Sequence, residues 1–365
     1  MSDYMQHALD LARRGQGQTS PNPAVGAVLV RDGDIVGQGF HTWAGVKHAE
    51  IIALEEAHET ARGATLYVTL EPCSHRGRTS PCADAVIQSG VKRVIAAMGD
   101  PNPQVGGQGF EKLRQAGIDV SISGNHTAAA EKLNEPFVHF MKTGLPLVTI
   151  KAALTLDGKI AAPQDNIGWI TSEVARADVQ QVRHLSDAIL TGLGTVAGDD
   201  CLLTDRSGLE RSRPLLRIVL DSQLRIPLNS KMVISAKDDV MVVGTSAAPP
   251  ERRKALEEAG VHVLIADGPG GRTDPRTVLD YLARHRYLSL MVEAGSHVNW
   301  TMLDSQIADK VLFYYAPKIL GGLKSLPVAG GPGRMRRADA MLLERLTVHS
   351  VSTDEFAVEA YVVKN

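Results

Sequence analysis

The sequence predicts a protein of two successive α/β domains. Three observations support this prediction: the chain of 365 residues exceeds the size of one ordinary core, helical and strand-like patterns alternate along both halves, and one breaker segment divides them. That segment is Thr143-Gly144-Leu145-Pro146, where Gly and Pro end one helical pattern and a new extended run follows. We therefore expect domains at residues 1–144 and 146–365.

The first half alternates helices with short strands. Apolar residues at Met5, Ala8, Leu9 and Ala12 recur with the period of an α-helix, and Gly33 lies in a turn between two strand-like runs. We expect helices at residues 4–14, 49–62, 82–89, 109–116 and 127–142. We expect strands at residues 25–30, 35–40, 65–70 and 94–98.

The second half repeats this alternation and predicts a mainly parallel sheet covered by helices. We expect strands at residues 148–152, 188–191, 216–220, 240–244, 261–264 and 288–293, and helices at 173–185, 251–259 and 277–284. The run at 288–293 is interpreted as the last parallel strand. The runs at 345–351 and 356–363 alternate with period two and predict a C-terminal hairpin.

Composition and charge argue against several classes of function. The net charge is −2 and no run of five basic residues occurs, so we expect a small-molecule enzyme and no nucleic-acid partner. No stretch of 18 apolar residues occurs, so we expect no membrane partner. An odd number of cysteines, three, and an N-terminus without a secretory pattern predict a reducing, cytoplasmic location.

A candidate zinc site lies in the first half, in His48-Ala49-Glu50, Glu71-Pro72-Cys73 and Pro81-Cys82. Catalytic zinc takes three protein ligands and keeps one position open for water, and we assign His48, Cys73 and Cys82 as the ligands. Glu50 follows a ligand by two residues and is placed to carry protons between the water and the substrate. His48 and Cys82 each stand where a helix begins, and a helix N-terminus favours a thiolate.

Other interpretations of these residues remain open. A lone His or Cys is more often a core residue than a ligand, and zinc could stabilise a binding module without chemistry. Three ligands with Glu50 beside them differ from the four ligands of a closed structural site. A tRNA or nucleoside deaminase with an accessory domain is another alternative.

Strand ends in the second half offer places for a phosphorylated cofactor. The glycines of 192–198 follow a strand and could bring backbone amides close to phosphate, although a tight strand-to-helix turn explains them equally well. Ser222, with Arg225 shortly after it, could hold the 2′-phosphate of NADP. Glu293-Ala294-Gly295-Ser296 ends another strand and opens a helix.

The first half resembles the bifunctional riboflavin-biosynthesis deaminase/reductase family. The resemblance rests on Ser20-Pro21-Asn22-Pro23, His41, His48-Ala49-Glu50 and Leu70-Glu71-Pro72-Cys73-Ser74-His75-Arg76-Gly77-Arg78-Thr79-Ser80-Pro81-Cys82. Eight residues separate the two cysteines here, whereas cytidine and tRNA adenosine deaminases have two. The resemblance implies that Asn22 and His41 contact a pyrimidine and that the loop 74–80 shapes the pocket. From the residues alone, Asn22 also fits a turn and His41 a solvated loop.

The resemblance continues through the second half, in the run 151–159, in 169–172, at Thr195 and Asp199-Asp200, and in 292–295. It implies NADPH contacts at Ala153, Trp169, Thr195, Asp199, Ser222, Gly295, Ser296, His297, Val298, Asn299, Trp300 and Thr301. It implies contacts with the reductase substrate at Lys151, Arg183, Leu203, Arg206 and Glu293. Two positions depart from the family pattern: Ile167 replaces a polar residue, and Cys201, interpreted as structural, replaces a Pro.

The same resemblance implies a fold and a reaction. We expect a cytidine-deaminase-like three-layer α/β/α domain followed by a dihydrofolate-reductase-like α/β domain, in a homo-oligomer, either a dimer or a tetramer. One Zn²⁺ per chain would support deamination of a diaminopyrimidinone ribosylamino 5′-phosphate, and NADPH would then reduce the ribosyl group to ribityl. A deaminase joined to an inactive reductase domain remains an alternative.

Overall fold

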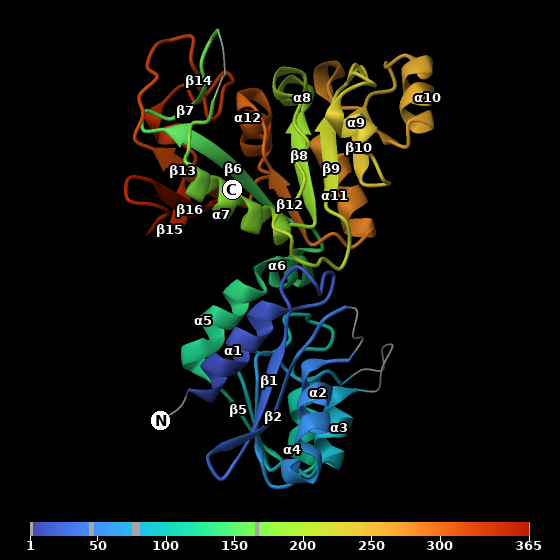
Figure 1. Cartoon of the computed structure of the whole chain (residues 1–365), viewed down its shortest axis with the longest axis vertical. Coiled ribbons are helices and arrows are strands. Elements are labelled where there is room, and N and C mark those ends of the chain that lie inside the picture. The colour runs from blue at the N-terminus through green and yellow to red at the C-terminus, as the bar shows by residue number, and fades with distance from the viewer. Residues whose placement is uncertain (1–2, 44–46, 75–80, 165–167, 365) are drawn as a thin grey trace. The chain divides into compact units, whose positions relative to one another are not determined.

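The computed structural model describes residues 3–43, 47–74, 81–164 and 168–364, which form two compact units (Figure 1). Unit 1 comprises Met1–Gly144 and Glu210–Arg213, and unit 2 comprises Leu145–Leu209 and Pro214–Asn365. The expected boundary at residue 144 had placed 210–213 in the second domain. This segment groups with unit 1 because the N–H of Ser212 donates to the carbonyl of Gly17 at 3.0 Å and its Oγ donates to that of Ser20 at 2.9 Å.

Unit 1 is built on a five-stranded mixed sheet with the strand order β2-β1-β3-β4-β5. Its strands are β1 (Gly26–Arg31), β2 (Asp34–Phe40), β3 (Thr65–Val68), β4 (Arg93–Ala96) and β5 (Asp119–Ile122). Strand β1 pairs antiparallel with both β2 and β3, whereas β3, β4 and β5 run parallel. The buried strand residues, Leu29 and Leu66 among them, form one core with the helices on both faces.

Helices cover both faces of this sheet, α1 and α5 on one and α2, α3 and α4 on the other (Figure 1). The helices are α1 (Tyr4–Arg14), α2 (Ala49–Ala57), α3 (Cys82–Gln88), α4 (Gln108–Gln115), α5 (Gly124–Leu133) and α6 (Glu135–Thr143), with a short 3-10 helix, η1 (His58–Ala61). The expected three-layer α/β/α architecture is confirmed.

Two glycines of β2 let α2 approach the sheet closely. A Cβ at Gly37 would lie 2.2 Å from the carbonyl oxygen of Ala53, and one at Gly39 would lie 2.6 Å from that of Ala49. No real side chain tolerates such distances, so these glycines fix the depth at which α2 packs. They therefore position the start of α2, which carries His48 and Glu50.

Unit 2 is built on a nine-stranded sheet with the order β11-β10-β9-β8-β12-β6-β13-β16-β15. Its strands are β6 (Leu147–Thr155), β8 (Ala188–Gly192), β9 (Leu216–Leu220), β10 (Val240–Gly244), β11 (His262–Ile265), β12 (Ser289–Val292), β13 (Lys310–Ala316), β15 (Leu343–Ser350) and β16 (Phe356–Val362). All pairs from β11 to β13 are parallel, and β16 and β15 add an antiparallel hairpin. The mainly parallel sheet and its terminal hairpin were both expected.

Helices and a small second sheet complete unit 2. Its helices are α7 (Glu173–His184), α8 (Leu193–Asp199), α9 (Lys231–Ile234), α10 (Pro250–Glu258), α11 (Pro275–Arg284) and α12 (Ser296–Asp304), with 3-10 helices η2 (Pro269–Gly271) and η3 (Arg337–Asp339). The short strands β7 (Lys159–Ala161) and β14 (Leu326–Pro327) form a two-stranded sheet. Two apolar cores fill the space between the helices and the large sheet, as the expected dihydrofolate-reductase-like class requires.

The structure corrects several boundaries. The single helix expected at 127–142 is two helices, α5 and α6, because the side chain of Asn134 bonds both backbone polar groups of Ala24 and Pro136 lacks the N–H that a continuous helix needs. The helix expected at 49–62 ends at Ala57, since His58 has φ +47°.

Strands β5 and β13 were not expected. Since β13 pairs parallel with β6, the interpretation of 288–293 as the last parallel strand was wrong.

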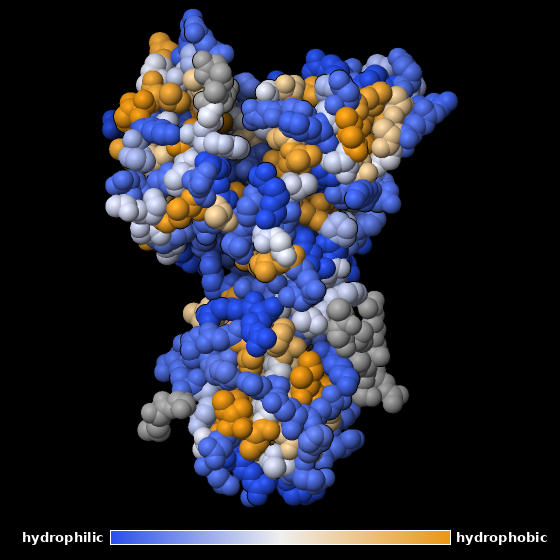
Figure 2. All heavy atoms as spheres, viewed as in Figure 1, coloured by the Kyte–Doolittle hydropathy of each residue, from blue (hydrophilic) through white to orange (hydrophobic). Residues whose placement is uncertain are grey.

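The surface in Figure 2 is mostly hydrophilic, with hydrophobic residues in small separate patches on the face in view. Within the described part of the chain, no helix combines the length and the apolar character needed to cross a bilayer.

Candidate functional site

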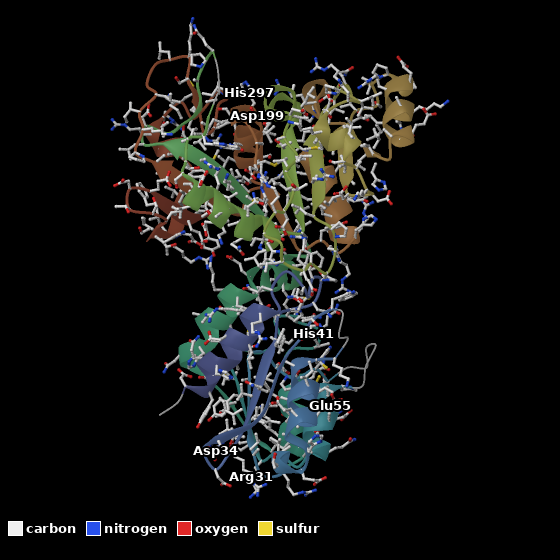
Figure 3. All side chains as sticks on the ribbon, in the orientation of Figure 1. Arg31, Asp34, His41, Glu55, Asp199 and His297 are labelled. Carbon is white, nitrogen blue, oxygen red and sulfur yellow. The ribbon has the colours of Figure 1, made fainter. Side chains whose placement is uncertain are left out.

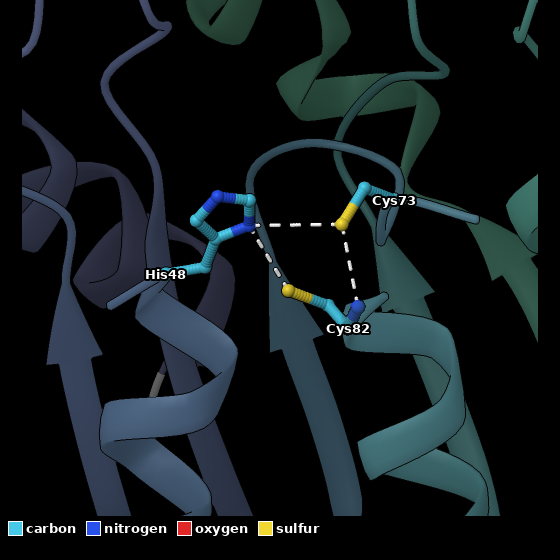
Figure 4. A group of neighbouring side chains, drawn as sticks. All are labelled: His48, Cys73 and Cys82. Atoms are coloured by element: carbon cyan, nitrogen blue, oxygen red, sulfur yellow. Dashed lines mark hydrogen bonds between the residues drawn. The ribbon is translucent and has the colours of Figure 1, made fainter. Parts of the chain in front are cut away.

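Three elements of unit 1 bring His48, Cys73 and Cys82 together (Figure 4). His48 is the N-cap residue of α2, and Cys82 is the first residue of α3, as expected. Cys73 lies on the segment that follows β3 and faces the start of α3. The carbonyl of Cys73 accepts a hydrogen bond from the N–H of Ala83 at 3.1 Å, which ties this segment to α3.

The potential ligand atoms of these residues all lie within 4.8 Å of one another. Nδ1 of His48 is 3.0 Å from Sγ of Cys82 and 3.7 Å from Sγ of Cys73. The N–H of Cys82 donates to Sγ of Cys73 at 3.3 Å. One imidazole nitrogen and two sulfur atoms are a ligand set that suits catalytic zinc, so these residues fit that ion.

The two thiols are strongly coupled through hydrogen bonds. The hydrogen bond from the Cys82 thiol lowers the pKa of Cys73 to about 4, and the same interaction raises the pKa of Cys82. The hydrogen bond to Cys73 also raises the pKa of His48. The Cys73 thiol therefore ionises readily, while the Cys82 thiol retains its proton. A divalent cation that binds both sulfur atoms can take the place of that proton.

Glu50 is buried beside this cluster, on the first turn of α2. Burial raises the pKa of its carboxyl to about 7, against the opposing positive charge of His48. A carboxyl with a pKa near neutrality can both accept and donate a proton, which suits general acid–base catalysis.

His41 and Asn22 lie next to each other near the cluster, and the ring centroids of His41 and His48 are 5.3 Å apart. Nδ1 of His41 faces the carbonyl of Lys47 at 2.8 Å and must donate, so Nε2 accepts from Nδ2 of Asn22 at 3.2 Å. Burial lowers the pKa of His41, which favours this neutral form. The structure thus groups both with the metal cluster. The expected pocket loop lies outside the described residues over 75–80.

In unit 2, the predicted substrate residues Lys151, Arg183 and Glu293 form one buried ionic cluster. Nζ of Lys151 lies 3.0 Å from Oε1 of Glu293, while Nε and one terminal nitrogen of Arg183 bind Oε2 at 3.0 and 2.8 Å. Burial opposes ionisation of Glu293, but Lys151 and Arg183 together hold its pKa below the usual value. These residues come from β6, from α7 and from the end of β12, so three distant segments meet here.

Sequence reasoning missed Tyr314, which is also part of this region. The ammonium of Lys151 lies 5.9 Å from the ring centroid of Tyr314, and the Tyr314 hydroxyl donates to Asp178 at 2.6 Å. Burial raises the pKa of this tyrosine, so it stays protonated. Tyr314 lies on β13, where it pairs with Ala153 of β6. Recognising β13 as a strand of the sheet would have placed Tyr314 near the cluster.

The loop after α8 carries two more predicted substrate residues. Leu203 is buried with φ +51°, a backbone conformation that is uncommon for residues other than glycine. Arg206 is exposed, and its N–H is held by the side chain of Gln180 at 2.9 Å. The carbonyl of Thr204, between them, accepts from Arg183 at 3.1 Å, which links this loop to the ionic cluster. Burial raises the pKa of Cys201 to about 11, in keeping with a structural role.

Thr195 of α8 and residues 295–298, from the N-cap of α12 onward, lie at neighbouring helix starts, whereas Asp199 is the last residue of α8. A Cβ at Gly295 would lie 3.9 Å from Oγ1 of Thr195, and one at Gly192 would lie 2.9 Å from the side chain of Val298. Figure 3 labels Asp199 and His297, which come from these two helices. Since α8 and α12 both begin after parallel strands, their free amides meet at the edge where such sheets bind cofactors.

Several residues of α12 hold a neighbouring segment. The side chains of Ser296, His297 and Asn299 bind the carbonyls of Pro327, Gly330 and Val328 at 2.5, 2.9 and 2.8 Å. Trp300 lies against Gly331, where a Cβ would come 2.2 Å from its ring, and Thr301 bonds the carbonyl of His297. These side chains therefore shape the surface by positioning 327–331.

The remaining predicted cofactor residues are dispersed. Trp169 is 68% exposed, with the Arg176 guanidinium 4.9 Å from its ring centroid and its carbonyl bound by Lys318 at 2.7 Å. Ser222 follows β9, and its Oγ accepts from the N–H of Thr273 at 3.2 Å. Ala153 lies on β6. Ile167 lies outside the described residues.

Comparison with known proteins accounts for both units. The sequence profile of the cytidine and deoxycytidylate deaminase zinc-binding region matches residues 1–98, and that of the RibD C-terminal domain matches 146–354. The riboflavin biosynthesis protein RibD of Escherichia coli is 42% identical over 366 residues, covering 96% of each chain. That of Actinobacillus pleuropneumoniae is 40% identical, covering 96% of this chain and 93% of the relative.

The chain belongs to the RibD family. Its fold matches Acinetobacter baumannii RibD with a TM-score of 0.87, 37% identity and coverage of 99% of this chain and 98% of that one. A Thermotoga maritima structure described as a diaminohydroxyphosphoribosylaminopyrimidine deaminase/5-amino-6-(5-phosphoribosylamino)uracil reductase matches with a TM-score of 0.84, 35% identity and the same coverage. As a RibD-family protein, the chain is a bifunctional deaminase and reductase of riboflavin biosynthesis that acts on a small molecule.

The buried cluster of the RibD reductase unit leads to a first prediction. Glu293→Gln leaves Lys151 and Arg183 buried without their counter-charge, and breaking such a pair costs about 3–5 kcal/mol. We expect the thermal unfolding temperature of unit 2 to fall and the deamination rate to stay unchanged. Because Glu293 has a lowered pKa when folded, its stabilising effect exists above the ordinary Glu pKa and is lost as the pH falls through the lowered value. The free energy of unfolding of the variant should therefore not show this decrease at acid pH.

A matched control is Glu258→Gln, which removes a carboxylate from an exposed pair with Lys254 on α10. Calorimetry between pH 3 and 8 compares the three proteins. Equal unfolding temperatures for Glu293→Gln and the wild type at neutral pH would rule out a structural role for the carboxylate.

Proposed function

We propose that this chain hydrolyses the 2-amino group of 2,5-diamino-6-ribosylamino-4(3H)-pyrimidinone 5′-phosphate and then reduces the ribosyl side chain with NADPH. The product is 5-amino-6-ribitylamino-uracil 5′-phosphate. The observation that carries the proposal is the His48–Cys73–Cys82 cluster with the buried Glu50 beside it. The similarity to the Thermotoga maritima deaminase/reductase supports the choice of substrate.

In this proposal, residues 1–144 carry the deaminase, and His48, Cys73 and Cys82 hold one Zn²⁺. When bound, the zinc lowers the pKa of a water molecule and so supplies the nucleophile. Glu50 would take one proton from that water and deliver it to the ring nitrogen, and it would carry the water's second proton to the amino group, which leaves as ammonia. A pKa of about 7 suits both transfers. Asn22 and His41 orient the pyrimidine, since their mutual hydrogen bond leaves the carboxamide oxygen of Asn22 to accept from a substrate N–H.

Residues 146–365 carry the reductase in this proposal. Lys151 and Glu293 orient the sugar, and Arg183 fixes Glu293. Leu203 and Arg206, on the loop after α8, contact the substrate, and the exposed Arg206 pairs with the 5′-phosphate. NADPH supplies the hydride that reduces C1 of the opened sugar. Its contacts are proposed at Ala153, Trp169, Thr195, Asp199, Ser222, Gly295, Ser296, His297, Val298, Asn299, Trp300 and Thr301.

The deaminase assignment is tested with Glu50→Gln. The amide retains the size of Glu50 but cannot carry the proton, so we expect one zinc per chain and ammonia release reduced by about 10²-fold or more. Zinc is measured by elemental analysis and ammonia by a coupled assay with the diaminopyrimidinone phosphate. The control is Glu55→Gln on the same helix, where the carboxylate is exposed and pairs with Lys47. Undiminished ammonia release from the Glu50 variant would remove Glu50 from the mechanism.

The cofactor assignment is tested with Ser222→Asp. A carboxylate at this strand end would repel the 2′-phosphate of NADPH, so we expect the KM for NADPH to rise by at least about 10-fold and that for NADH to change little. Reduction of the deaminated substrate is followed at 340 nm with each cofactor. An equal loss with both cofactors would place Ser222 away from the 2′-phosphate, and no reduction by the wild type would indicate an inactive reductase domain.

We also propose that the protein is a cytoplasmic homo-oligomer, a dimer or a tetramer. Strand β15 supports the oligomer, because it is the outermost strand of the large sheet and all its residues are exposed, including Leu343, Leu346 and Val348. An exposed apolar edge strand is a template for pairing with another chain.

The three cysteines form no disulfides, which supports the proposed location in a reducing compartment, the cytoplasm. Cell fractionation tests this location.

The oligomer is tested by light scattering after gel filtration. We expect the wild-type mass to be a multiple of 39.2 kDa and the Val348→Lys variant to shift towards a single chain, because a charge blocks apolar edge pairing. Ile234→Lys, at an exposed apolar residue on α9, should keep the wild-type mass. A wild-type protein of single-chain mass would contradict the proposal.

A further inference from the structure

Glu71 is a buried carboxylate two residues before Cys73. Its carboxylate is held by four backbone amides and the residue is 5% exposed. Oε2 accepts from the N–H groups of Asp100 and Gly107 at 3.0 and 2.9 Å, and Oε1 accepts from those of Gly109 and Phe110 at 2.8 and 3.2 Å. A carboxylate without such donors would be costly to bury, so these contacts fix both oxygens.

These contacts make Glu71 the N-terminal cap of a helix that is distant in the sequence. Helix α4 begins after Gly107, which has no side chain to cap it. Gly109 and Phe110 are the second and third residues of α4, the positions whose free amides a capping side chain normally satisfies. The positive end of the helix dipole also favours a carboxylate there. Glu71 therefore ties its own segment to α4.

The same segment is tied to α3 through Cys73. The carbonyl of Cys73 accepts from Ala83, and its sulfur accepts from the N–H of Cys82 at 3.3 Å. On the α4 side, Pro72 packs so tightly that a Cβ at Gly109 would lie 2.0 Å from its carbonyl oxygen. The residues 71–73 are thus held between the starts of two helices.

An ion pair joins the same two helices further along. Nζ of Lys112 on α4 lies 2.5 Å from Oδ1 of Asp84 on α3. A shift of the Glu71 segment against α4 would therefore move Cys73 relative to Cys82.

We propose that Glu71 is a positioning residue for zinc, which sets the place of the Cys73 sulfur by anchoring residues 71–73 to α4. This inference rests on the zinc site of the proposed function. Glu71 does not itself reach the metal cluster in this assignment, and it acts through the backbone that it shares with Cys73. Groups that orient metal ligands in this indirect way typically change metal affinity by about 10–100-fold when they are replaced.

The test is Glu71→Gln. The substitution turns one acceptor into an NH₂ group that faces two backbone N–H groups, so the anchor is lost with little change of volume. We expect the zinc Kd, measured by competition with a chromophoric chelator, to rise by about 10–100-fold. We also expect the thiolate-to-metal charge-transfer band of the Co²⁺-substituted protein to weaken or shift, which a purely structural role would not cause.

The control is Asp3→Asn, which alters another capping carboxylate of unit 1, at the start of α1, where Asp3 accepts from Gln6 at 3.0 Å. Its zinc Kd and Co²⁺ spectrum should match those of the wild type. A Glu71→Gln protein with wild-type zinc Kd and Co²⁺ spectrum would overturn the inference. A wild-type protein that binds no zinc would instead overturn the proposed function.

A second measurement uses the wild-type protein and decides the matter if the variant does not fold. Coupling is reciprocal, so removing zinc with a chelator should loosen the contacts of Glu71. We expect the amides of Gly107, Gly109 and Phe110 to exchange with deuterium at least about 5-fold faster, while those of α1 keep their rates. Unchanged exchange at these three amides would also overturn the inference.

Discussion

The backbone N–H of Cys82 donates to the sulfur of Cys73, and this contact determines how far apart the two thiols of the deaminase unit lie. It exists because α3 begins at Cys82, so the amide has no partner within its own helix. His48 completes the cluster from the start of α2, which two glycines of β2 allow to pack closely on the sheet. The positions of His48, Cys73 and Cys82 are therefore consequences of helix starts and sheet packing within the α/β/α unit.

In the reductase unit, opposite charges fix the position of the central polar residue, Glu293. Glu293 lies at the end of a strand in the middle of the sheet, where burial opposes its ionisation, and Lys151 and Arg183 reach it from neighbouring elements and hold its pKa below the usual value. Replacing any one residue of this cluster would destabilise the unit, since the replacement leaves another charge unpaired. The cluster also gives the sheet a fixed set of polar atoms against which a sugar can be oriented.

The sequence was most informative where chemistry and local structure coincide. The pattern of His48, Cys73 and Cys82 predicted that these three residues come together, and the Pro before α3 predicted where that helix begins. Strand β13 was missed, and Tyr314 with it, since its pairing with β6 joins residues about 160 positions apart. The break between α5 and α6 was missed although Pro136 marks it in the sequence; the contact that fixes it is long-range, because Asn134 is held by Ala24, on a segment far away in the chain.

Two carboxylates, Glu71 and Glu293, differ in how far the sequence reveals the groups that balance their charge. Glu293 is balanced by Lys and Arg, so opposite charges in the sequence hint at a pair even though they do not identify it. Glu71 is balanced by peptide dipoles, which every residue carries and no pattern reveals. Amides in a folded loop cannot move as freely as a lysine side chain, so a carboxylate that they bind has a narrowly defined position. That difference makes an amide-bound carboxylate the better anchor for the backbone of Cys73, two residues away.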